Sequence, residues 1–257
     1  LYLSLMLGET MPDMTVKHLI VDEAQDYSPL QMKSLARLFP SAGITILGDM
    51  NQNISPYASG GSLDDIARLV SPDDYEFMQL NKSYRSTVEI NRFAAGFLNL
   101  PEGEYFGRHG EKPRLILCGD YPRLCHALAD ALALLTDKKY KTAAIITRTL
   151  AEAKLIYKAL QKQANKNPLP FRLMDEDFEY GLEGIMVMPA YLAKGLEFDS
   201  AMIVIPNEND YSNPDETGLF YTAVTRPLHD LSRFCSLSHL PSVLQSANLD
   251  HYTIERL

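Results

Sequence analysis

The stretch His18-Leu19-Ile20-Val21-Asp22-Glu23-Ala24-Gln25-Asp26 joins a mostly apolar run directly to two adjacent carboxylates. Because the apolar run does not alternate with polar residues, it predicts a strand over residues 16–22 that is buried on both faces, as in parallel α/β sheets. Ligands of such sheets bind just beyond the carboxyl ends of the strands. There, one carboxylate suffices to hold a hard cation such as Mg²⁺, and a second beside it can orient or deprotonate water. The alternative is a strand end followed by a solvated acidic turn.

Composition narrows the class of protein. The chain has 257 residues, 46% of them hydrophobic, which suits one or two globular domains with a sizeable core. No apolar run is long enough to span a bilayer and no signal-peptide pattern opens the sequence, so we expect no membrane partner. Cys118, Cys125 and Cys235 show no metal-ligand or redox spacing, which favours a reducing, cytoplasmic location. A net charge of −9 disfavours unassisted binding to a phosphate backbone.

Strands and helices alternate along the first third of the chain. Ser28 before Pro29 is typical of a helix N-cap, and Pro40 marks the end of that helix. Ser62 is expected to cap a second helix in the same way. The expected elements are a strand at 16–22, a helix after Pro29, a strand at 44–47, a helix at 63–70 and a third short strand at 77–80.

A second series of strands and helices follows. It begins with a helix that carries Ile90, Phe93 and Phe97, and a surface loop rich in Gly, Pro and charge is expected at 101–113. Strands are then expected at 114–118, 143–147, 171–174, 185–188, 201–205 and 231–237, and helices at 121–135, 150–163 and 216–226. This alternation predicts a parallel sheet with helices on its faces, which is an α/β fold.

Five short motifs stand in a fixed order along the chain, and together they make a chance match very improbable. They are Val21-Asp22-Glu23-Ala24-Gln25-Asp26, Leu47-Gly48-Asp49-Met50-Asn51-Gln52, Ser83-Tyr84-Arg85-Ser86, Ala193-Lys194-Gly195-Leu196-Glu197-Phe198 and Tyr221-Thr222-Ala223-Val224-Thr225-Arg226. In this order they resemble motifs II to VI of the UvrD/Rep class of superfamily 1 helicases, over about residues 16 to 237. The segment 189–195 and the short spacing between motifs resemble most the HelD/helicase IV branch, some members of which act with RNA polymerase.

The resemblance implies a fold and a domain organisation. It implies RecA-like (P-loop NTPase) parallel sheets flanked by helices. Residues 1–78 would be the C-terminal part of a first RecA-like domain, and residues 79–257 a nearly complete second one. The implied cofactors are ATP and Mg²⁺, with the nucleotide held between the two domains.

The resemblance also implies roles in ATP hydrolysis. Asp22 would hold Mg²⁺ and Glu23 would be the general base for water. Gln52 would bridge that water and the terminal phosphate. Arg85 and Arg226 would clamp the γ-phosphate, which suits the planar, always charged guanidinium group. Without the resemblance, Arg85 could cap the helix before it, and Arg226 could serve the last turn of its own helix, where cations are favoured.

Three further residues would bind the nucleotide. Tyr84 would stack on the adenine, Glu197 would accept a hydrogen bond from the ribose, and Gly195 would allow a close backbone turn. The alternatives are a core-edge tyrosine for Tyr84 and an exposed turn pair for Lys194 and Glu197.

Two departures from the family pattern bear on function. The chain has no Gly-Lys dipeptide and hence no phosphate-binding loop. We expect that loop upstream of Leu1, in a missing N-terminal part, and we expect the chain alone to lack useful ATPase activity. The chain also has no Trp to stack on single-stranded DNA. Tyr57, after the second motif, and Tyr191, just before the fourth, are the candidates for nucleic-acid contact, although Tyr57 could as easily be a loop aromatic.

Two functions are compatible with this sequence. The first is an ATP-dependent helicase or translocase that couples hydrolysis to movement on single-stranded or tailed duplex DNA. The second is a HelD-like factor that remodels RNA polymerase, with weak or no unwinding. The acidic charge, the missing Trp and the fourth motif favour the second.

Overall fold

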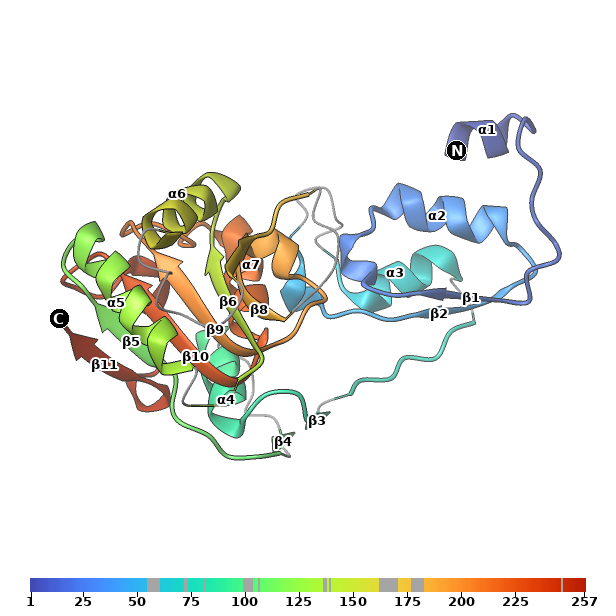
Figure 1. The fold of residues 1–257 in the computed structure, drawn as a ribbon. Coiled ribbons are helices and arrows are strands. Elements are labelled where there is room, and N and C mark those ends of the chain that lie inside the picture. The colour runs from blue at the N-terminus through green and yellow to red at the C-terminus, as the bar shows by residue number, and fades with distance from the viewer. Residues whose placement is uncertain are drawn as a thin grey trace. The chain divides into compact units, whose positions relative to one another are not determined.

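The structure is a computed structural model that describes residues 1–257 apart from 55–60, 72–73, 81, 99–103, 106, 136–137, 139, 162–170, 177–182 and 246. Tyr57 lies outside the described residues. The chain divides into two compact units, unit 1 (Leu1–Leu80) and unit 2 (Asn81–Leu257), whose elements are labelled in Figure 1. No helix in the described part of the chain combines the length and the apolar character needed to cross a membrane.

Unit 1 is built on a two-stranded parallel sheet, β1–β2. Its elements are α1 (Tyr2–Met6), β1 (His18–Val21), the 3-10 helix η1 (Ala24–Asp26), α2 (Pro29–Leu38), β2 (Gly43–Ile46), the 3-10 helix η2 (Met50–Gln52) and α3 (Leu63–Val70). The two expected N-caps are confirmed. Ser28 and Ser62 each accept a hydrogen bond from the backbone N–H three residues on, and each forms a complete capping box.

The prediction that the first strand is buried on both faces is wrong. Leu19 and Val21 pack into a cluster with Met32 of α2 and Ile66 of α3, whereas Ile20 is 65% exposed. Successive residues of a strand point to opposite faces, and in unit 1 the described helices α2 and α3 contribute to the cluster on one face only. The run therefore contains more apolar side chains than unit 1 itself buries.

The prediction of a short strand at residues 77–80 is also wrong. The structure has no regular element there, and Met78 and Leu80 are 76% and 86% exposed. An apolar tetrapeptide becomes a strand only when a neighbouring strand satisfies its backbone groups, and the described residues of unit 1 offer none at this position.

Unit 2 contains a seven-stranded sheet in the order β11-β5-β10-β9-β6-β8-β7, in which every neighbouring pair is parallel. Its strands are β5 (Arg114–Leu117), β6 (Thr142–Thr147), β7 (Phe171–Leu173), β8 (Gly184–Pro189), β9 (Phe198–Ile205), β10 (Pro227–Cys235) and β11 (Thr253–Arg256). A separate parallel pair joins β3 (Lys82–Ser83) to β4 (Glu104–Tyr105). The helices are α4 (Val88–Phe97), α5 (Tyr121–Leu135), α6 (Leu150–Gln161) and α7 (Pro214–Val224), with 3-10 helices η4 (Ala190–Ala193), η5 (Ser242–Leu244) and η6 (Leu249–His251).

Helices cover both faces of this sheet, as the alternation of elements predicts (Figure 1). Helices α5 and α6 pack on one face in a cluster that includes Ile145. Helices α4 and α7 pack on the other face in a cluster that includes the next residue, Ile146. Both isoleucines are fully buried, because the central strands have a hydrophobic layer on each side.

Candidate functional site

In unit 1, the residues that follow β1 and β2 lie at the same edge of the sheet. Val21 is in register with Ile46, and the backbone N–H of Leu47 donates to the Val21 carbonyl at 2.8 Å. The N–H of Ala24 in turn donates to the Leu47 carbonyl at 2.8 Å. The first and second motifs, at 21–26 and 47–52, are therefore directly hydrogen-bonded to each other.

The buried amide of Gln25 orients the carboxylate of Glu23. Gln25 is 1% exposed, its Nε2 donates to Glu23 Oε2, and its Oε1 accepts from the backbone N–H of Asp49 at 3.1 Å. Glu23 has a left-handed backbone with φ 52°, a conformation that non-glycine residues adopt mainly where the surroundings enforce it, as at functional sites. Asp22 beside it is exposed, and its Oδ1 accepts from the Glu23 N–H at 2.8 Å.

Asp49 connects this arrangement to Gln52. One carboxylate oxygen of Asp49 accepts from the backbone N–H of Asn51 at 3.0 Å, and the other accepts from Nε2 of Gln52 at 3.0 Å. The hydrogen bonds thus run from Glu23 through Gln25 and Asp49 to Gln52. Unit 1 holds all three of its candidate residues, Asp22, Glu23 and Gln52, at one sheet edge.

We predict that Gly48→Ala destabilises this edge. A Cβ at Gly48 would lie 2.5 Å from Oε1 of Gln25 and 3.2 Å from the Ala24 nitrogen. Alanine must therefore displace the buried Gln25 amide, at an expected cost of about 1–3 kcal/mol in the free energy of unfolding. Urea unfolding measures this cost. Gly107→Ala is the control, because a Cβ there meets an atom only at 3.7 Å and should change stability by less than about 0.5 kcal/mol. Equal stability of the two variants would contradict the bridging role of Gln25.

In unit 2, an ion pair joins the third and fourth motifs. Nε of Arg85 lies 2.7 Å from Oε1 of Glu197, and both side chains are about half exposed, at 47% and 45%. The adjacent Ser86 hydroxyl donates to the Pro227 carbonyl at 2.6 Å in a buried contact. Residues 85–86 are therefore held against residue 197 and against the residue that follows Arg226.

Arg226 is the buried member of this cluster. Its side chain is 2% exposed, its Nε donates to the Thr222 carbonyl at 2.9 Å, and its Nη1 donates to the Leu196 carbonyl at 3.4 Å. The first bond shows that Arg226 does serve the last turn of α7. The second joins it to the fourth motif, so that unit 2 brings Arg85, Glu197 and Arg226 together.

The remaining candidates lie at more exposed positions of unit 2. Tyr84 is 66% exposed to solvent. Gly195 has φ +76°, and no atom lies within 4 Å of the position that a Cβ would occupy. Glycine is therefore favoured there because the backbone is left-handed, and not because another group packs closely against it. The Tyr191 hydroxyl donates to Glu176 at 3.4 Å, and the side chain is partly open to solvent at 36% exposure.

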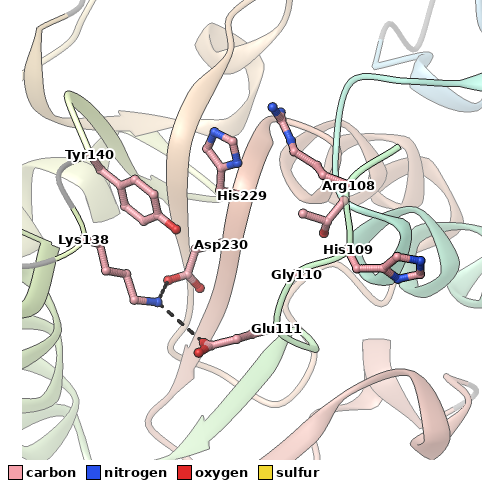
Figure 2. Close-up of a pocket in the computed structure, with 9 residues that line it drawn as sticks. Arg108, His109, Gly110, Glu111, Lys138, Tyr140, His229 and Asp230 are labelled. Carbon is pink, nitrogen blue, oxygen red and sulfur yellow. Dashed lines mark hydrogen bonds and ion pairs between the residues drawn. The ribbon is translucent and has the colours of Figure 1, made fainter. Parts of the chain in front are cut away.

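A polar hollow of about 360 Å³ lies beside residue 85 in unit 2. Arg108 at its rim donates to the Arg85 carbonyl at 3.0 Å, and the His229 ring stacks on Tyr140 at 5.7 Å between centroids. Figure 2 shows these side chains around the hollow. Its lining consists of Thr87, Arg108, His109, Gly110, Glu111, Lys138, Tyr140, His229 and Asp230.

The charges that line this hollow are largely paired. Lys138 lies 2.6 Å from Asp230 and 3.5 Å from Glu111, and both contacts are drawn in Figure 2. Burial lowers the pKa of Lys138, but the hydrogen bond and charge of Asp230 and the charge of Glu111 raise that pKa above its ordinary value. Because two carboxylates neutralise the ammonium group, the hollow as a whole does not favour an anion.

Three residues that position the candidate groups were not identified from the sequence. Gln25 stood within the first motif but had no assigned role, and its burial was the missing information. The Ser86 hydroxyl bond to Pro227 spans 141 residues, and the Arg108 bond to residue 85 comes from a loop outside every motif. No local pattern signals contacts of this kind.

Asp22 fits a magnesium ligand of the kind that uses few protein groups. Among the residues that the structure describes, no three His, Cys, Asp or Glu side chains gather as a metal cage. Mg²⁺ at phosphate sites is held mainly by the phosphates and water, with one or two carboxylates. The exposed carboxylate of Asp22 at the end of β1 suffices for that role.

Comparisons with known proteins agree with this fold. No protein-family model and no curated protein matches the chain. The C-terminal domain of a possible DNA helicase from Lactobacillus plantarum WCFS1 is 29% identical with a TM-score of 0.56, over 67% of this chain and 98% of that chain. Dbp5 of S. cerevisiae, in a structure bound to RNA and ADP BeF3, is 14% identical with a TM-score of 0.57, over 99% of this chain and 63% of that chain. These neighbours are RecA-like helicase domains, so the predicted α/β RecA-like fold is confirmed.

Proposed function

We propose that this chain serves an ATP-dependent helicase or translocase of superfamily 1 that moves on single-stranded DNA. The observation on which this depends most is the cluster in unit 2, where Arg85 pairs with Glu197 at 2.7 Å and Arg226 donates to the carbonyl of Leu196. Three separate motifs thereby present guanidinium and carboxylate groups in one place. The similarity to a helicase C-terminal domain at 29% identity supports a helicase-like function at a coarser level.

In this proposal, unit 1 provides the groups that act on water. Glu23, oriented by Gln25, accepts the proton of the attacking water, and Gln52 positions that water. Asp22 would hold Mg²⁺, and the ion would supply positive charge that neutralises the phosphates. The hydrogen bonds that connect Glu23 to Gln52 through Asp49 keep these groups in a constant arrangement before substrate arrives.

Unit 2 provides the cationic groups in this proposal. Arg85 is the better exposed of the two candidate clamps and reaches a phosphate by exchanging its partner Glu197 for the ligand. Arg226 is buried, so its contact with a phosphate requires a rearrangement of the residues around it. Tyr84 stacks on the base and Glu197, once released, accepts from the ribose hydroxyl.

A second candidate is a HelD-like factor that remodels RNA polymerase. The net charge of −9 and the absence of Trp favour it, because single-stranded nucleic acid is bound mainly by cationic groups on its phosphates and by aromatic rings stacked on its bases. It shares the ATP chemistry of the first candidate and differs in the macromolecule on which the motor acts.

Assays on the full-length protein separate the two candidates. If the first is correct, single-stranded DNA raises the rate of ATP hydrolysis, the stimulation falls with added salt, and a tailed duplex is separated without polymerase. A polymerase pull-down is run in parallel. Retention on RNA polymerase together with a hydrolysis rate that DNA leaves unchanged would contradict the first candidate and favour the second.

A further inference from the structure

Arg233, in the middle of β10, is fully buried at 0% exposure and has no role in the proposed ATP chemistry. Its guanidinium carbon lies 4.0 Å from the ring centroid of Phe93 in α4 and 4.6 Å from that of Tyr252, which precedes β11. The two rings meet edge to face at 77°. The guanidinium group therefore sits in an aromatic corner formed by a helix and the C-terminal segment.

The hydrogen-bonding capacity of this corner is mostly unused. Nε of Arg233 donates to the Arg114 carbonyl at 3.3 Å, but Nη1 and Nη2 of Arg233 have no partner within the described residues. The hydroxyl of Tyr252, itself 4% exposed, also has none there. Three buried polar atoms from neighbouring side chains thus lack partners in one place, whereas buried polar groups are nearly always hydrogen-bonded.

The charge of Arg233 is unbalanced as well. No ion pair within the described parts of the chain includes Arg233, and the one charge interaction resolved for it is with Tyr252. Burial lowers the pKa of the guanidinium to about 9, so the group is still charged at pH 7. Cation–π contacts offset only part of the cost of burying a charge, and a bound anion would remove the remainder.

We propose that Arg233 is the binding site of a small monocarboxylate anion. Nη1 and Nη2 would donate in parallel to the two carboxylate oxygens, which is the pairing that the guanidinium fork favours. The Tyr252 hydroxyl would donate a third hydrogen bond. A monovalent anion cancels the single charge of Arg233, whereas a dianion would leave an uncompensated negative charge in an apolar corner.

The C-terminal segment offers a route to this site. Tyr252 lies between η6 and β11, and β11 is the edge strand of the sheet, paired only with β5. Three of the four residues of β11 are exposed, so little apolar surface holds the strand in place. Displacement of this segment moves Tyr252 and opens the corner to a small anion.

Thermal unfolding of the 257-residue chain at pH 7 tests this proposal. We expect sodium formate to raise the melting temperature above that in sodium chloride of equal ionic strength, by about 2–4 °C near saturation. Arg233→Met should abolish the formate effect. Arg172→Met, which removes an exposed arginine of β7, should retain it. A melting temperature that formate leaves unchanged, or an equal rise in the Arg233→Met variant, would overturn the proposal.

A second variant covers the case in which Arg233→Met does not fold. Tyr252→Phe keeps the ring that contacts Arg233 and removes only the hydroxyl, so the chain should fold and respond to formate with a reduced shift. An undiminished shift in Tyr252→Phe would overturn the role of this corner. A shift in sulfate, which is a dianion at pH 7, as large as that in formate and abolished by Arg233→Met would overturn the assignment to a monovalent carboxylate. None of these results depends on ATP hydrolysis or on nucleic acid.

Discussion

Arg85→Ala is expected to lower kcat for ATP hydrolysis by the full-length protein by about 10³-fold or more, the magnitude typical of an arginine that stabilises a transferring phosphoryl group. The same change should leave folding nearly intact. The Arg85–Glu197 pair is about half exposed, and exposed ion pairs contribute at most about 1 kcal/mol to stability. Steady-state hydrolysis and thermal unfolding of the same preparation separate the two effects.

A matched arginine provides the control for this prediction. Arg123 is also exposed and lies 3.6 Å from Asp120, but it is far from every motif in the sequence. Arg123→Ala should therefore hydrolyse ATP at the rate of the unmodified protein. Arg85→Lys should fall between Arg85→Ala and the unmodified protein, because lysine keeps the charge and loses the bidentate fork. Unchanged kcat in Arg85→Ala would remove Arg85 from the proposed site.

Glu23→Gln is expected to lower kcat by about 10²–10⁴-fold, the usual contribution of a general base. Glutamine preserves the size of the side chain and can still accept the hydrogen bond from Gln25, so the loss should come from the missing base and not from rearrangement. Single-turnover hydrolysis measures the chemical step, and binding of a labelled nucleotide should be nearly unchanged.

The control for Glu23 comes from the same unit. Glu76 is an exposed glutamate of unit 1, and Glu76→Gln should have no effect on kcat. If Glu23→Gln turns over ATP at the rate of Glu76→Gln, Glu23 is not the base. In that case the left-handed backbone and the Gln25 contact at Glu23 would be features of the turn alone.

Local signals in the sequence were sufficient for most of the fold. The helix that begins at Pro29 and the one that begins at Leu63 were predicted from their serine caps, because a cap depends on residues only three positions apart. The central strands of unit 2 were predicted from apolar runs such as residues 143–147. The edge strand β11 was missed, since Thr253–Arg256 contains one apolar residue and becomes a strand only by pairing with β5.

The candidate site, like the fold, was predicted only in part from the sequence. The motifs predicted which residues matter, and the order of the motifs predicted their type of chemistry. The sequence did not predict that Gln25 would connect Glu23 to the backbone of Asp49. Nor did it predict that Arg226 would be buried against Thr222 and Leu196. Both contacts depend on the side-chain packing of segments that are distant in sequence.

The sequence by itself determined the α/β alternation, the capped helices and the set of polar residues at the strand ends, because each of these is encoded by neighbouring residues. Only the tertiary structure decided that Arg85 meets Glu197, that one face of β1 stays exposed and that Arg233 is buried without a counter-charge among the described residues. The physical reason is that strand order and helix packing determine which distant side chains come together and whether they are buried or exposed to solvent. Charge pairing and burial are properties of that environment and not of the local chain.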